Sequence, residues 1–408
     1  MTQPLRVAYI MSRFPKITET FILYEMLAVM QEGVQVEVYP LMRGDPVMHP
    51  EAEPLAAAAH YTPHLSPGVV ISNVQLLVRH PRRYLSTLWT ALRATQGSRR
   101  FFTGVLAFFG KSVHMGRLMQ RQGIDHIHAH FASFPAATAY IIHRLTGIPY
   151  SFTAHGSDLH RDQHFLREKV DGAAFTVAIS RYNRQVILEH CGEQYADRVP
   201  VVHCGVDTSL FRPLDAPKPG DQPLQLVCTG TLHEVKGQTY LITACAELAR
   251  RGVAFECHLV GDGPDRAALE AQVAQAGLQD RVIFHGSVLR ARVVELLRCA
   301  DIVVQPSVPT RDGRREGIPV ATMEAMACGT AVVASALSGI PELVEDGVSG
   351  VLVPPGDAER LATTLGQLAR DPARRAQLGA AARQRILDEF DLARNAALLA
   401  RMFAENAP

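Results

Sequence analysis

Residues 316–335 read "EGIPVATMEAMACGTAVVAS". Pro319 suits the first turn of a helix, where a missing N–H costs nothing, and Gly329 suits the position just past its end. We therefore predict a helix from about Ile318 to Cys328. The apolar, β-branched run after it predicts a strand. A helix that leads into a buried strand is half of the repeating unit of a parallel α/β sheet.

The same alternation of short apolar runs and helical patterns continues along most of the chain, which favours parallel sheets covered by helices. In the first half the runs are "RVAYI", "VQVEVYP", "DHIHAHF", "PYSFTAH", "FTVAIS" and "VPVVHCG"; in the second half they are "LQLVCTG", "FECHLVG", "RVIFHG", "DIVVQPS" and "TAVVAS". Residues 212–225, "RPLDAPKPGDQPLQ", hold four prolines and a glycine between the two sets. Such a composition is typical of a domain linker.

The sequence thus predicts an α/β protein with two Rossmann-like, doubly wound domains, since 408 residues exceed one typical core. We expect the first domain at residues 1–213, with a basic helical insertion at about 65–122, and the second at residues 214–385. Ligands of such sheets bind beyond the carboxyl ends of the strands. A cleft between the two domains is the expected active site.

Composition indicates an ordinary globular protein, with 47% hydrophobic and 20% charged residues. The seven cysteines are scattered and form no CxxC motif, which favours a reducing compartment. Arg6 and Arg13 interrupt the early apolar stretch, so no signal peptide is expected. No apolar run approaches the roughly 18 residues of a membrane span. We expect a cytoplasmic protein.

Two carboxylates flank the start of the predicted helix after Pro319. The first N–H groups of a helix have no partner within it and attract anionic or electron-rich oxygen. Glu316 lies at this position, and Glu324 lies about one turn inside, on the face of Val320. A carboxylate is a poor phosphate ligand but a good acceptor for sugar hydroxyls. The pair therefore suggests a ligand that carries both phosphate and sugar.

Glycine and lysine mark two other strand ends. "TGTLHEVKGQTYLI" puts Lys236 directly before a helix, where a lysine can meet a phosphate already held by backbone N–H groups. The alternative is a solvated lysine beside a capping glycine. "VGDGP" at residues 260–264 ends a strand at Gly261 and opens a helix. A plain tight turn explains that segment equally well.

The first half offers basic and imidazole side chains. Arg13 and Lys16, in "SRFPKITETFI", follow the first strand and are expected to face the cleft. A G-x-G-x-x-G motif is absent there, which argues against an NAD or FAD oxidoreductase. His155 in "FTAHGSDLH" could hydrogen-bond a sugar hydroxyl or the reacting oxygens, or be structural.

"HIHAHF" sets three histidines on one face of a strand, a spacing that could bind metal: His126, His128 and His130. No matching cysteine or carboxylate cluster is visible in the sequence. We expect no metal.

These segments together resemble a known family. "VHCGVDTSLFRP", "TLHEVKG", "VGDGP", "EGIPVATMEAMACGTAVVAS" and "SGIPELVEDGVSGVLVPPGD" resemble the retaining family 4 glycosyltransferases of the GT-B fold. The opening "SRFPKITETFILYEM", with "FTAHGSDL", is most similar to the exopolysaccharide branch of that family, the colanic-acid type. The resemblance spans roughly residues 6 to 400.

The resemblance implies a role for each motif residue. Glu316 would contact the donor sugar, Glu324 the ribose hydroxyls, and Lys236 would neutralise the diphosphate. His155 would lie beside the sugar. The other donor-binding positions would be Gly230, Thr231, Gly261, His285, Gly286, Gly317, Ile318 and Pro319, of which His285 and Gly286 would read the base through their backbone. The last helix, within residues 386–408, would cross back onto the N-terminal domain.

Thr231 departs from the family pattern. An arginine usually follows the glycine of this strand as a second diphosphate ligand. Arg314 or Arg315 could supply the missing charge.

The reaction implied by the resemblance is transfer of a hexose, with retention, from a nucleotide sugar to a glycan or lipid-linked acceptor. The donor would be a UDP-sugar, with a GDP-sugar as second choice. Front-side attack would let the leaving diphosphate take the acceptor's proton, so no enzyme base, metal or other cofactor is needed. A nonhydrolysing nucleotide-sugar epimerase, a phosphorylase and a catalytically silent nucleotide-sugar binder remain alternatives.

The net charge of +1 hides an asymmetry. From Pro54 to Ile124 there is no Asp or Glu, but there are nine basic residues: Arg79, Arg82, Arg83, Arg93, Arg99, Arg100, Lys111, Arg117 and Arg121. Within this stretch "RRFFTGVLAFFGK" reads as an interfacial helix. We expect a peripheral site on an anionic membrane surface. The alternative is that the phenylalanines pack on the sheet; nucleic-acid binding is not expected, because no motif for it is present.

Overall fold

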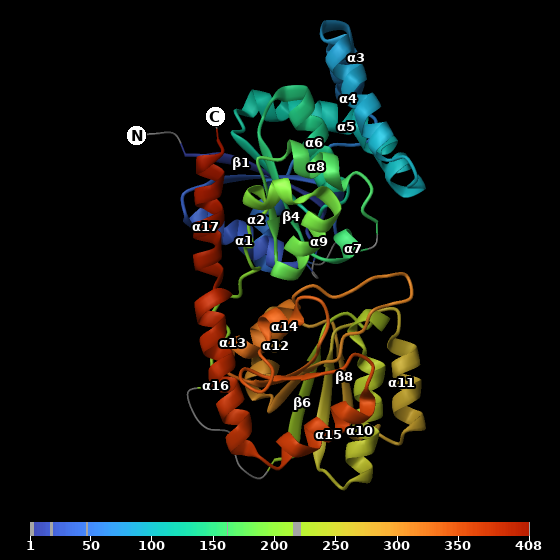
Figure 1. Ribbon diagram of the computed structural model, residues 1–408, viewed down its shortest axis with the longest axis vertical. Helices are drawn as coiled ribbons and strands as arrows, with labels where there is room; N and C mark the ends of the chain where they lie inside the picture. The colour runs from blue at the N-terminus through green and yellow to red at the C-terminus, as the bar shows by residue number, and fades with distance from the viewer. Residues whose placement is uncertain (1–3, 17–18, 46–47, 161, 215–221, 408) are drawn as a thin grey trace. The chain divides into compact units, whose positions relative to one another are not determined.

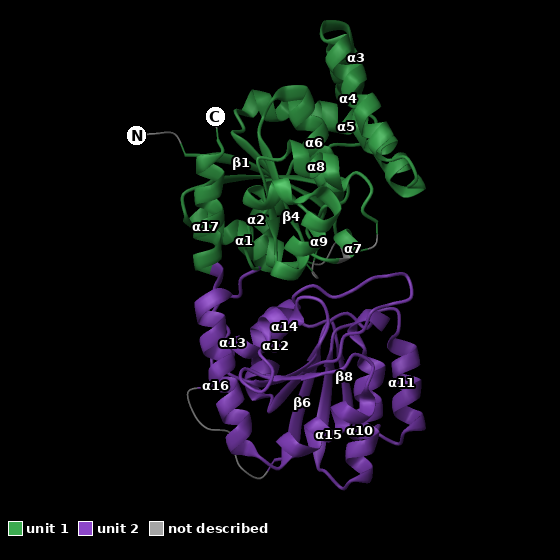
Figure 2. Cartoon of the chain, viewed as in Figure 1, with its two compact units in different colours: residues 1–203, 393–408 green, residues 204–392 purple. Residues whose placement is uncertain are grey.

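The computed structural model describes residues 4–16, 19–45, 48–160, 162–214 and 222–407. It divides into two compact units: unit 1 holds residues 1–203 and 393–408, and unit 2 holds residues 204–392 (Figure 2). The predicted division after residue 213 thus falls inside unit 2.

A backbone pairing within unit 2 explains that difference. The N–H of Val206 donates to Phe390 O at 2.9 Å, and the N–H of Leu392 donates to Val206 O at 3.1 Å. These bonds tie the segment after residue 203 to the end of the last helix of unit 2. Residues 215–221 of the predicted linker lie outside the described residues.

Unit 1 is built on a parallel sheet, as predicted. In its described residues the strand order is β2-β1-β3-β4-β5, of which β1 and β4 are labelled in Figure 1. The strands are β1 (Arg6–Phe14), β2 (Gln35–Arg43), β3 (His126–His130), β4 (Tyr150–Ala154) and β5 (Phe175–Ala178). The helices are α1 (Thr20–Gln31), α2 (Glu53–Ala58), α3 (Pro67–Arg79), α4 (Pro81–Ala94), α5 (Arg99–Gln122), α6 (Phe134–Thr146), α7 (Ser157–His160), α8 (Leu166–Gly172), α9 (Arg181–Cys191) and α17 (Leu392–Glu405).

The two faces of β3 bury different chemistry. Ile127 and Ala129 join the apolar core that α5 and α6 cover. The alternate residues of a strand point to the other face. There Phe403 of α17 lies with its ring centroid 5.3 Å from His126 and 5.1 Å from His128. One face of the C-terminal helix is therefore packed on the histidine face of the unit 1 sheet.

The insertion predicted at about residues 65–122 consists of α3, α4 and α5. Several side chains of α5 that were expected at a membrane surface are buried. Phe101 and Phe109 of α5 are buried in the core of unit 1, as the alternative interpretation held. Lys111 is also buried, and its ammonium group donates to Leu41 O. Burial lowers the pKa of Lys111 to about 8. The expectation of Lys111 at a membrane surface was wrong, because the apolar side of α5 faces the sheet.

Unit 2 also contains a parallel sheet, with the order β11-β10-β9-β6-β7-β8 among its described residues. The strands are β6 (Leu224–Thr229), β7 (Phe255–Val260), β8 (Val282–Gly286), β9 (Ile302–Gln305), β10 (Ala331–Ser335) and β11 (Val351–Val353). The helices are α10 (Gln238–Arg250), α11 (Arg266–Gln275), α12 (Arg290–Cys299), α13 (Val320–Ala327), α14 (Ile340–Leu343), α15 (Ala358–Ala369) and α16 (Pro372–Glu389).

Two strand assignments differ from the sequence prediction. Residues 199–205 form only an isolated bridge, between Val201 and Ala178. Pro200 has no N–H, so it cannot extend the ladder as a donor. The short strand β11 pairs with β10 and was not among the predicted runs. Three residues carry too little periodicity to be recognised in a sequence.

Removal of the Phe403 side chain should destabilise unit 1, because that ring is fully buried against the histidines of β3. We expect Phe403→Ala to lower the free energy of unfolding by about 3–5 kcal/mol in urea titrations. Leu398→Ala, on the exposed side of the same helix, should cost far less. Equal losses for the two variants would contradict the placement of α17.

Candidate active site

The carboxyl ends of β6, β7 and β8 meet closely in unit 2. The N–H of Gly230 donates to Val260 O at 2.9 Å, and the N–H of Gly261 donates to Gly286 O at 2.9 Å. A Cβ on Gly261 would lie 2.1 Å from Gly230 O, so only glycine fits there. Three of the predicted binding positions are thus adjacent at one edge of the sheet.

Lys236 lies above this edge, at the end of the short 3₁₀ helix η3 (Glu234–Lys236). Gly237 follows in the left-handed conformation, with φ +69°. A Cβ on Gly237 would lie 1.9 Å from Pro306 O, so the turn can approach the end of β9 only without a side chain. Gly237 therefore lets Lys236 lie at the edge of the sheet.

Lys236 and Glu316 form an ion pair in this position. The Nζ of Lys236 lies 2.8 Å from Glu316 Oε2, and both side chains are mostly buried. The hydroxyl of Ser307 donates to the same oxygen at 3.4 Å, and the amide of Gln305 donates to Ser307 Oγ at 2.7 Å. Sequence reasoning missed Gln305 and Ser307. Their place at the end of a predicted strand was the available signal.

The loop after Glu316 leads directly into α13. Helix α13 begins at Val320, two residues after the predicted start at Ile318. Pro319, which has an extended backbone, is its N-cap and not part of its first turn. The N–H groups of Gly317, Ile318, Val320 and Ala321 make no hydrogen bond to another residue in the described part of the chain. Unpaired N–H groups at a helix start attract anions. The structure thus supports the anion site inferred from Pro319 and Gly329.

Glu324 projects from the second turn of α13 and is partly buried. Burial raises the pKa of its carboxyl to about 7, and the charge of Arg290 opposes the shift. Within the described residues no hydrogen bond reaches this carboxylate. A partly buried carboxylate of this kind is suited to accept hydroxyl donors from a ligand.

Thr231 stands where the family usually has an arginine, so another residue would have to supply that positive charge. Thr231 is exposed, and its carbonyl accepts a hydrogen bond from Gln238 Nε2 at 3.0 Å. Arg314 Nη1 lies 3.3 Å from His233 Nε2, so Arg314 reaches the loop that carries Lys236. Arg315 is exposed. Of the two arginines considered for this role, the structure brings Arg314 to the loop.

His285 and Gly286 end β8. His285 Nε2 lies 2.9 Å from His258 Nδ1. On the other side of the His258 ring, Nε2 lies 2.8 Å from Gln225 Oε1. Burial, with a smaller contribution from Arg292, lowers the pKa of His285. The side chain of His285 is therefore engaged along the sheet.

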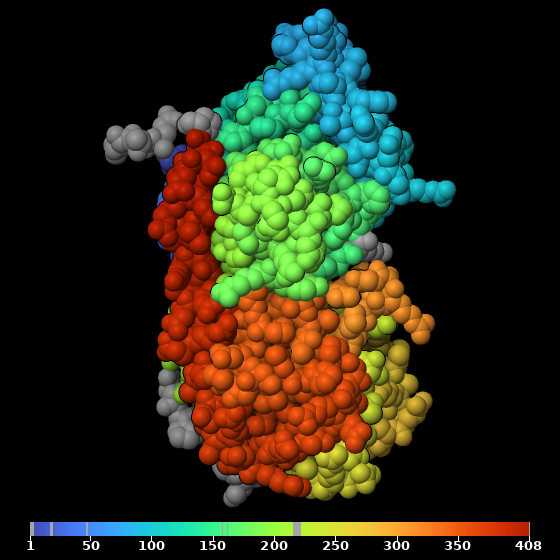
Figure 3. All heavy atoms as spheres, viewed as in Figure 1, coloured from blue at the N-terminus to red at the C-terminus, as the bar shows by residue number. Residues whose placement is uncertain are grey.

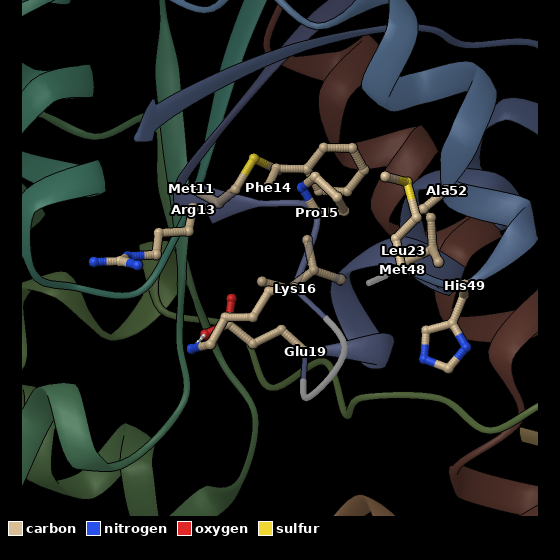
Figure 4. Close-up of a pocket in the computed structure, with 11 residues that line it drawn as sticks. Met11, Arg13, Phe14, Pro15, Lys16, Glu19, Leu23, Met48, His49 and Ala52 are labelled. Atoms are coloured by element: carbon tan, nitrogen blue, oxygen red, sulfur yellow. Dashed lines mark hydrogen bonds and ion pairs between the residues drawn. The ribbon is translucent and has the colours of Figure 1, made fainter. Parts of the chain in front are cut away.

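The remaining predicted residues belong to unit 1. Arg13 and Lys16 line a small pocket at the carboxyl end of β1 (Figure 4). Lys16 is paired with Glu19, whereas the Arg13 side chain extends away from that pair. Lys16 therefore has less free charge to offer a ligand than the sequence suggested.

His155 follows β4 and takes part in a chain of partly buried polar contacts. Its Nε2 lies 3.0 Å from His130 Nδ1, and His130 Nε2 lies 3.1 Å from Glu25 Oε1. The hydroxyl of Tyr9 donates to the same Glu25 oxygen at 3.3 Å. Burial and, secondly, the proximity of His130 hold the pKa of His155 well below its usual range. His155 is thus a neutral imidazole oriented by His130.

Asp158 fixes the loop that carries His155. Its carboxylate accepts hydrogen bonds from the N–H groups of Ala132, His155 and Gly156, at 2.6, 3.1 and 2.7 Å. Glu25 and Asp158 were both missed from the sequence. Asp158 stands within "FTAHGSDLH", next to the predicted histidine, whereas Glu25 carried no signal, because it is distant from His130 in the chain.

The three histidines of β3 lie on one face, as their spacing predicted. Glu25, His128 and His130 offer ligand atoms within 4.8 Å of one another, so the cluster has the residues to hold a metal ion. The atoms already have partners: Thr153 Oγ1 lies 3.0 Å from His128 Nε2, and Glu25 contacts His130. Because each atom has a hydrogen-bonding partner, we retain the prediction of no bound metal.

Comparison with known proteins assigns the chain to a family. The model of "Glycosyltransferase Family 4" matches residues 18–210, and that of "Glycosyl transferases group 1" matches residues 215–385. An amylovoran biosynthesis glycosyltransferase of Erwinia amylovora is 30% identical over 404 residues, which cover 95% of this chain and 96% of the relative. This chain is a family 4 glycosyltransferase. The resemblance seen in the sequence is confirmed.

Other relatives agree. A Salmonella typhimurium protein named as a colanic acid biosynthesis glycosyltransferase is 30% identical over 387 residues, 90% of this chain and 91% of its own length. The solved structure of Anabaena HepE in complex with UDP has a TM-score of 0.74 at 20% identity and covers 98% of this chain and 100% of its own. Its likeness shows the fold, and the parallel two-domain α/β class predicted from the sequence is confirmed.

Metal removal tests the histidine cluster of this glycosyltransferase. We expect the purified protein to contain no stoichiometric metal by mass spectrometry and to keep its melting temperature and full activity in excess EDTA. One metal ion per chain, or a loss in EDTA that divalent ions restore, would contradict the prediction and place an ion between Glu25, His128 and His130.

Proposed function

We propose that this family 4 glycosyltransferase moves a hexose, with retention, from a nucleoside diphosphate sugar to a glycan or lipid-linked acceptor in exopolysaccharide or cell-surface glycan synthesis. The observation that carries the proposal is the group in unit 2 of one ammonium, two carboxylates and a set of unpaired N–H groups. A nucleotide sugar carries the matching diphosphate and hydroxyls. The relatives named for colanic acid and amylovoran biosynthesis support the assignment to polysaccharide synthesis.

We assign the diphosphate to Lys236 and to the N–H groups before α13. Lys236 pairs with Glu316 in the structure. A bound diphosphate would take the place of Glu316 as partner of the ammonium group, and the Glu316 carboxylate would then accept hydrogen bonds from the hydroxyls of the donor sugar. Glu324 would accept the ribose hydroxyls. A UDP-sugar is the proposed donor, with a GDP-sugar as the second choice.

In the proposed reaction the acceptor oxygen bonds to the anomeric carbon while the bond from that carbon to the diphosphate oxygen breaks. The acceptor's proton passes to the departing diphosphate, so no side chain acts as base. The developing charge lies on that diphosphate, which Lys236 and the backbone N–H groups stabilise. His155, held neutral by burial, would offer its imidazole as a hydrogen-bonding partner for a sugar hydroxyl.

The reaction is tested by incubation with UDP-sugars, with and without acceptor, and by NMR of the product. Release of nucleoside diphosphate that depends on acceptor, with an α-linked product from an α-donor, is the expected result. Conversion of the sugar without acceptor would favour the epimerase, and thermal stabilisation by a nucleotide sugar without turnover would favour a silent binder.

Glu316→Ala should remove most activity and leave the fold intact. The position is at a ligand-facing loop and not in the apolar core. We expect kcat to fall by about 100-fold or more, as for removal of one transition-state contact, while urea unfolding keeps its cooperativity. The matched control is Glu234→Ala, an exposed carboxylate in the loop of Lys236. Turnover within a few-fold of wild type for Glu316→Ala would remove Glu316 from the donor site.

The raised pKa of Glu324, about 7, predicts a pH dependence of donor binding. Ribose hydroxyls donate to the ionised carboxylate, so the affinity for UDP-glucose should fall as the pH drops below about 7. The free energy of unfolding should change in the opposite sense and decrease as the pH rises from about 4.5 to 7, because the fold favours the neutral acid.

Glu324→Gln should remove both pH effects, and Glu324→Ala should raise the donor KM more than it lowers kcat. Calorimetric titration with UDP-glucose, which has no phosphate group ionising near pH 7, measures the binding. An unchanged pH profile in the Gln variant would show that Glu324 does not contact the donor.

A further inference from the structure

Helix α3 turns an apolar stripe to the solvent. Its outward residues follow helical spacing on one side: Val70, Ile71, Val74, Leu77 and Val78. Val69 and Ser72 on the opposite side are buried, and the amide of Asn73 donates to Gly110 O of α5 at 2.9 Å. The inner side of α3 is therefore fixed on α5, and the apolar stripe is left without a partner.

Helices α4 and α5 continue this surface with basic residues among the apolar ones. On α4 the outward stripe is Arg82, Leu85, Trp89 and Arg93, and the first turns of α5 add Arg99, Phe102 and Leu106. Tyr84, on the inner side of α4, packs on Phe109 with ring centroids 5.2 Å apart. Trp89 is 66% exposed. We call the outward stripes of α3, α4 and the start of α5 the insertion surface.

The insertion surface is unusual for a soluble domain. It carries nine of the nineteen exposed large apolar side chains of the described residues, although α3, α4 and the start of α5 form a small part of the chain. Figure 3 shows this segment, in blue to cyan, as a ridge that projects from unit 1. Apolar side chains gathered in this way mark an interaction site.

The charge of the surface is of one sign. Residues 54–124 contain no Asp or Glu, and in the described residues no ion pair involves Arg79, Arg82, Arg93 or Arg99. Nothing within the insertion neutralises these guanidinium groups. The partner must therefore combine anionic groups with an apolar phase.

Three partners can be compared with these requirements: a second copy of the chain, a nucleic acid and a membrane. A second copy in a two-fold dimer would bring basic surface against basic surface, which is repulsive. Nucleic acid would supply the phosphates but no phase for five exposed aliphatic residues of α3. A membrane with anionic lipids supplies both, and a tryptophan beside arginines is typical of the bilayer interface.

We propose that the insertion surface binds an anionic lipid bilayer, with the apolar stripes at the level of the acyl chains and the arginines at the headgroups. No helix among the described residues is long and apolar enough to cross a membrane, so the contact is interfacial. The surface differs from the segment of residues 99–111 that the sequence suggested. Its purpose, the approach to a lipid-linked acceptor, rests on the proposed function; the binding itself does not.

The tryptophan gives a direct test, because Trp89 is the only tryptophan of the chain. Addition of vesicles of phosphatidylglycerol and phosphatidylcholine at low salt should shift its emission to the blue, and brominated lipids should quench it. Vesicles of phosphatidylcholine alone should bind far more weakly, and salt should release the protein. No shift with anionic vesicles at low salt would overturn the proposal.

Charge variants locate the surface. The triple variant Arg79→Gln, Arg82→Gln, Arg93→Gln should lower vesicle partitioning on the order of 100-fold, since each basic residue near an anionic leaflet contributes roughly fivefold. The control Arg121→Gln, Arg360→Gln, Arg370→Gln removes the same charge from exposed positions elsewhere and should bind as wild type. Equal losses in the two triple variants would show that net charge alone is responsible.

The double variant Val74→Ser, Val78→Ser should weaken vesicle binding, and it leaves the tryptophan reporter in place. The control double variant Leu387→Ser, Leu398→Ser should bind vesicles as the wild type does. A blue shift without lipid, together with a dimer mass in light scattering, would overturn the proposal in favour of a second copy. Acceptor-dependent release of nucleoside diphosphate with a water-soluble acceptor should be unchanged in every surface variant. Vesicle binding and catalysis can thus fail separately.

Discussion

The close approach of backbone at the carboxyl edge of the unit 2 sheet is the constraint on which the candidate site depends. A Cβ on Gly261 would lie only 2.1 Å from Gly230 O, and a Cβ on Gly237 would lie only 1.9 Å from Pro306 O. Any side chain at either position would separate the loops. Because these loops touch, Lys236 reaches the Glu316 carboxylate, and the ion pair stands directly before the unpaired N–H groups of α13.

Unit 1 solves a different problem, the burial of polar groups in a parallel sheet. Parallel sheets covered on both faces are normally apolar. Here His126 and His128 share the hydroxyl of Ser151, at 2.7 and 2.8 Å, and Phe403 covers their rings. Burial, followed by the neighbouring imidazoles, keeps the pKa of His128 well below its usual range. The neutral histidines therefore fill the core at little electrostatic cost.

The insertion shows how one helix serves two environments. The inner side of α5 buries Phe101, Phe109 and the Lys111 amine, whose hydrogen bond to Leu41 O compensates for lost water. Its first exposed turn, with α3 and α4, leaves apolar and basic side chains outside. The fold of unit 1 does not need these exterior side chains, which is why their gathering on three successive helices points to a partner.

The sequence by itself determined the alternation of strands and helices, the glycine turns and the two-glutamate motif, because each of these is set by local backbone chemistry and by spacing. Only the tertiary structure decided which distant groups meet: Glu25 with His130, Lys236 with Glu316, and Phe403 with β3. It also decided which face of each helix is covered. Periodicity defines an apolar stripe but not whether that stripe packs on a core or remains exposed, so "RRFFTGVLAFFGK" was read as surface although much of it is interior, and the exposed stripe of α3 was not recognised.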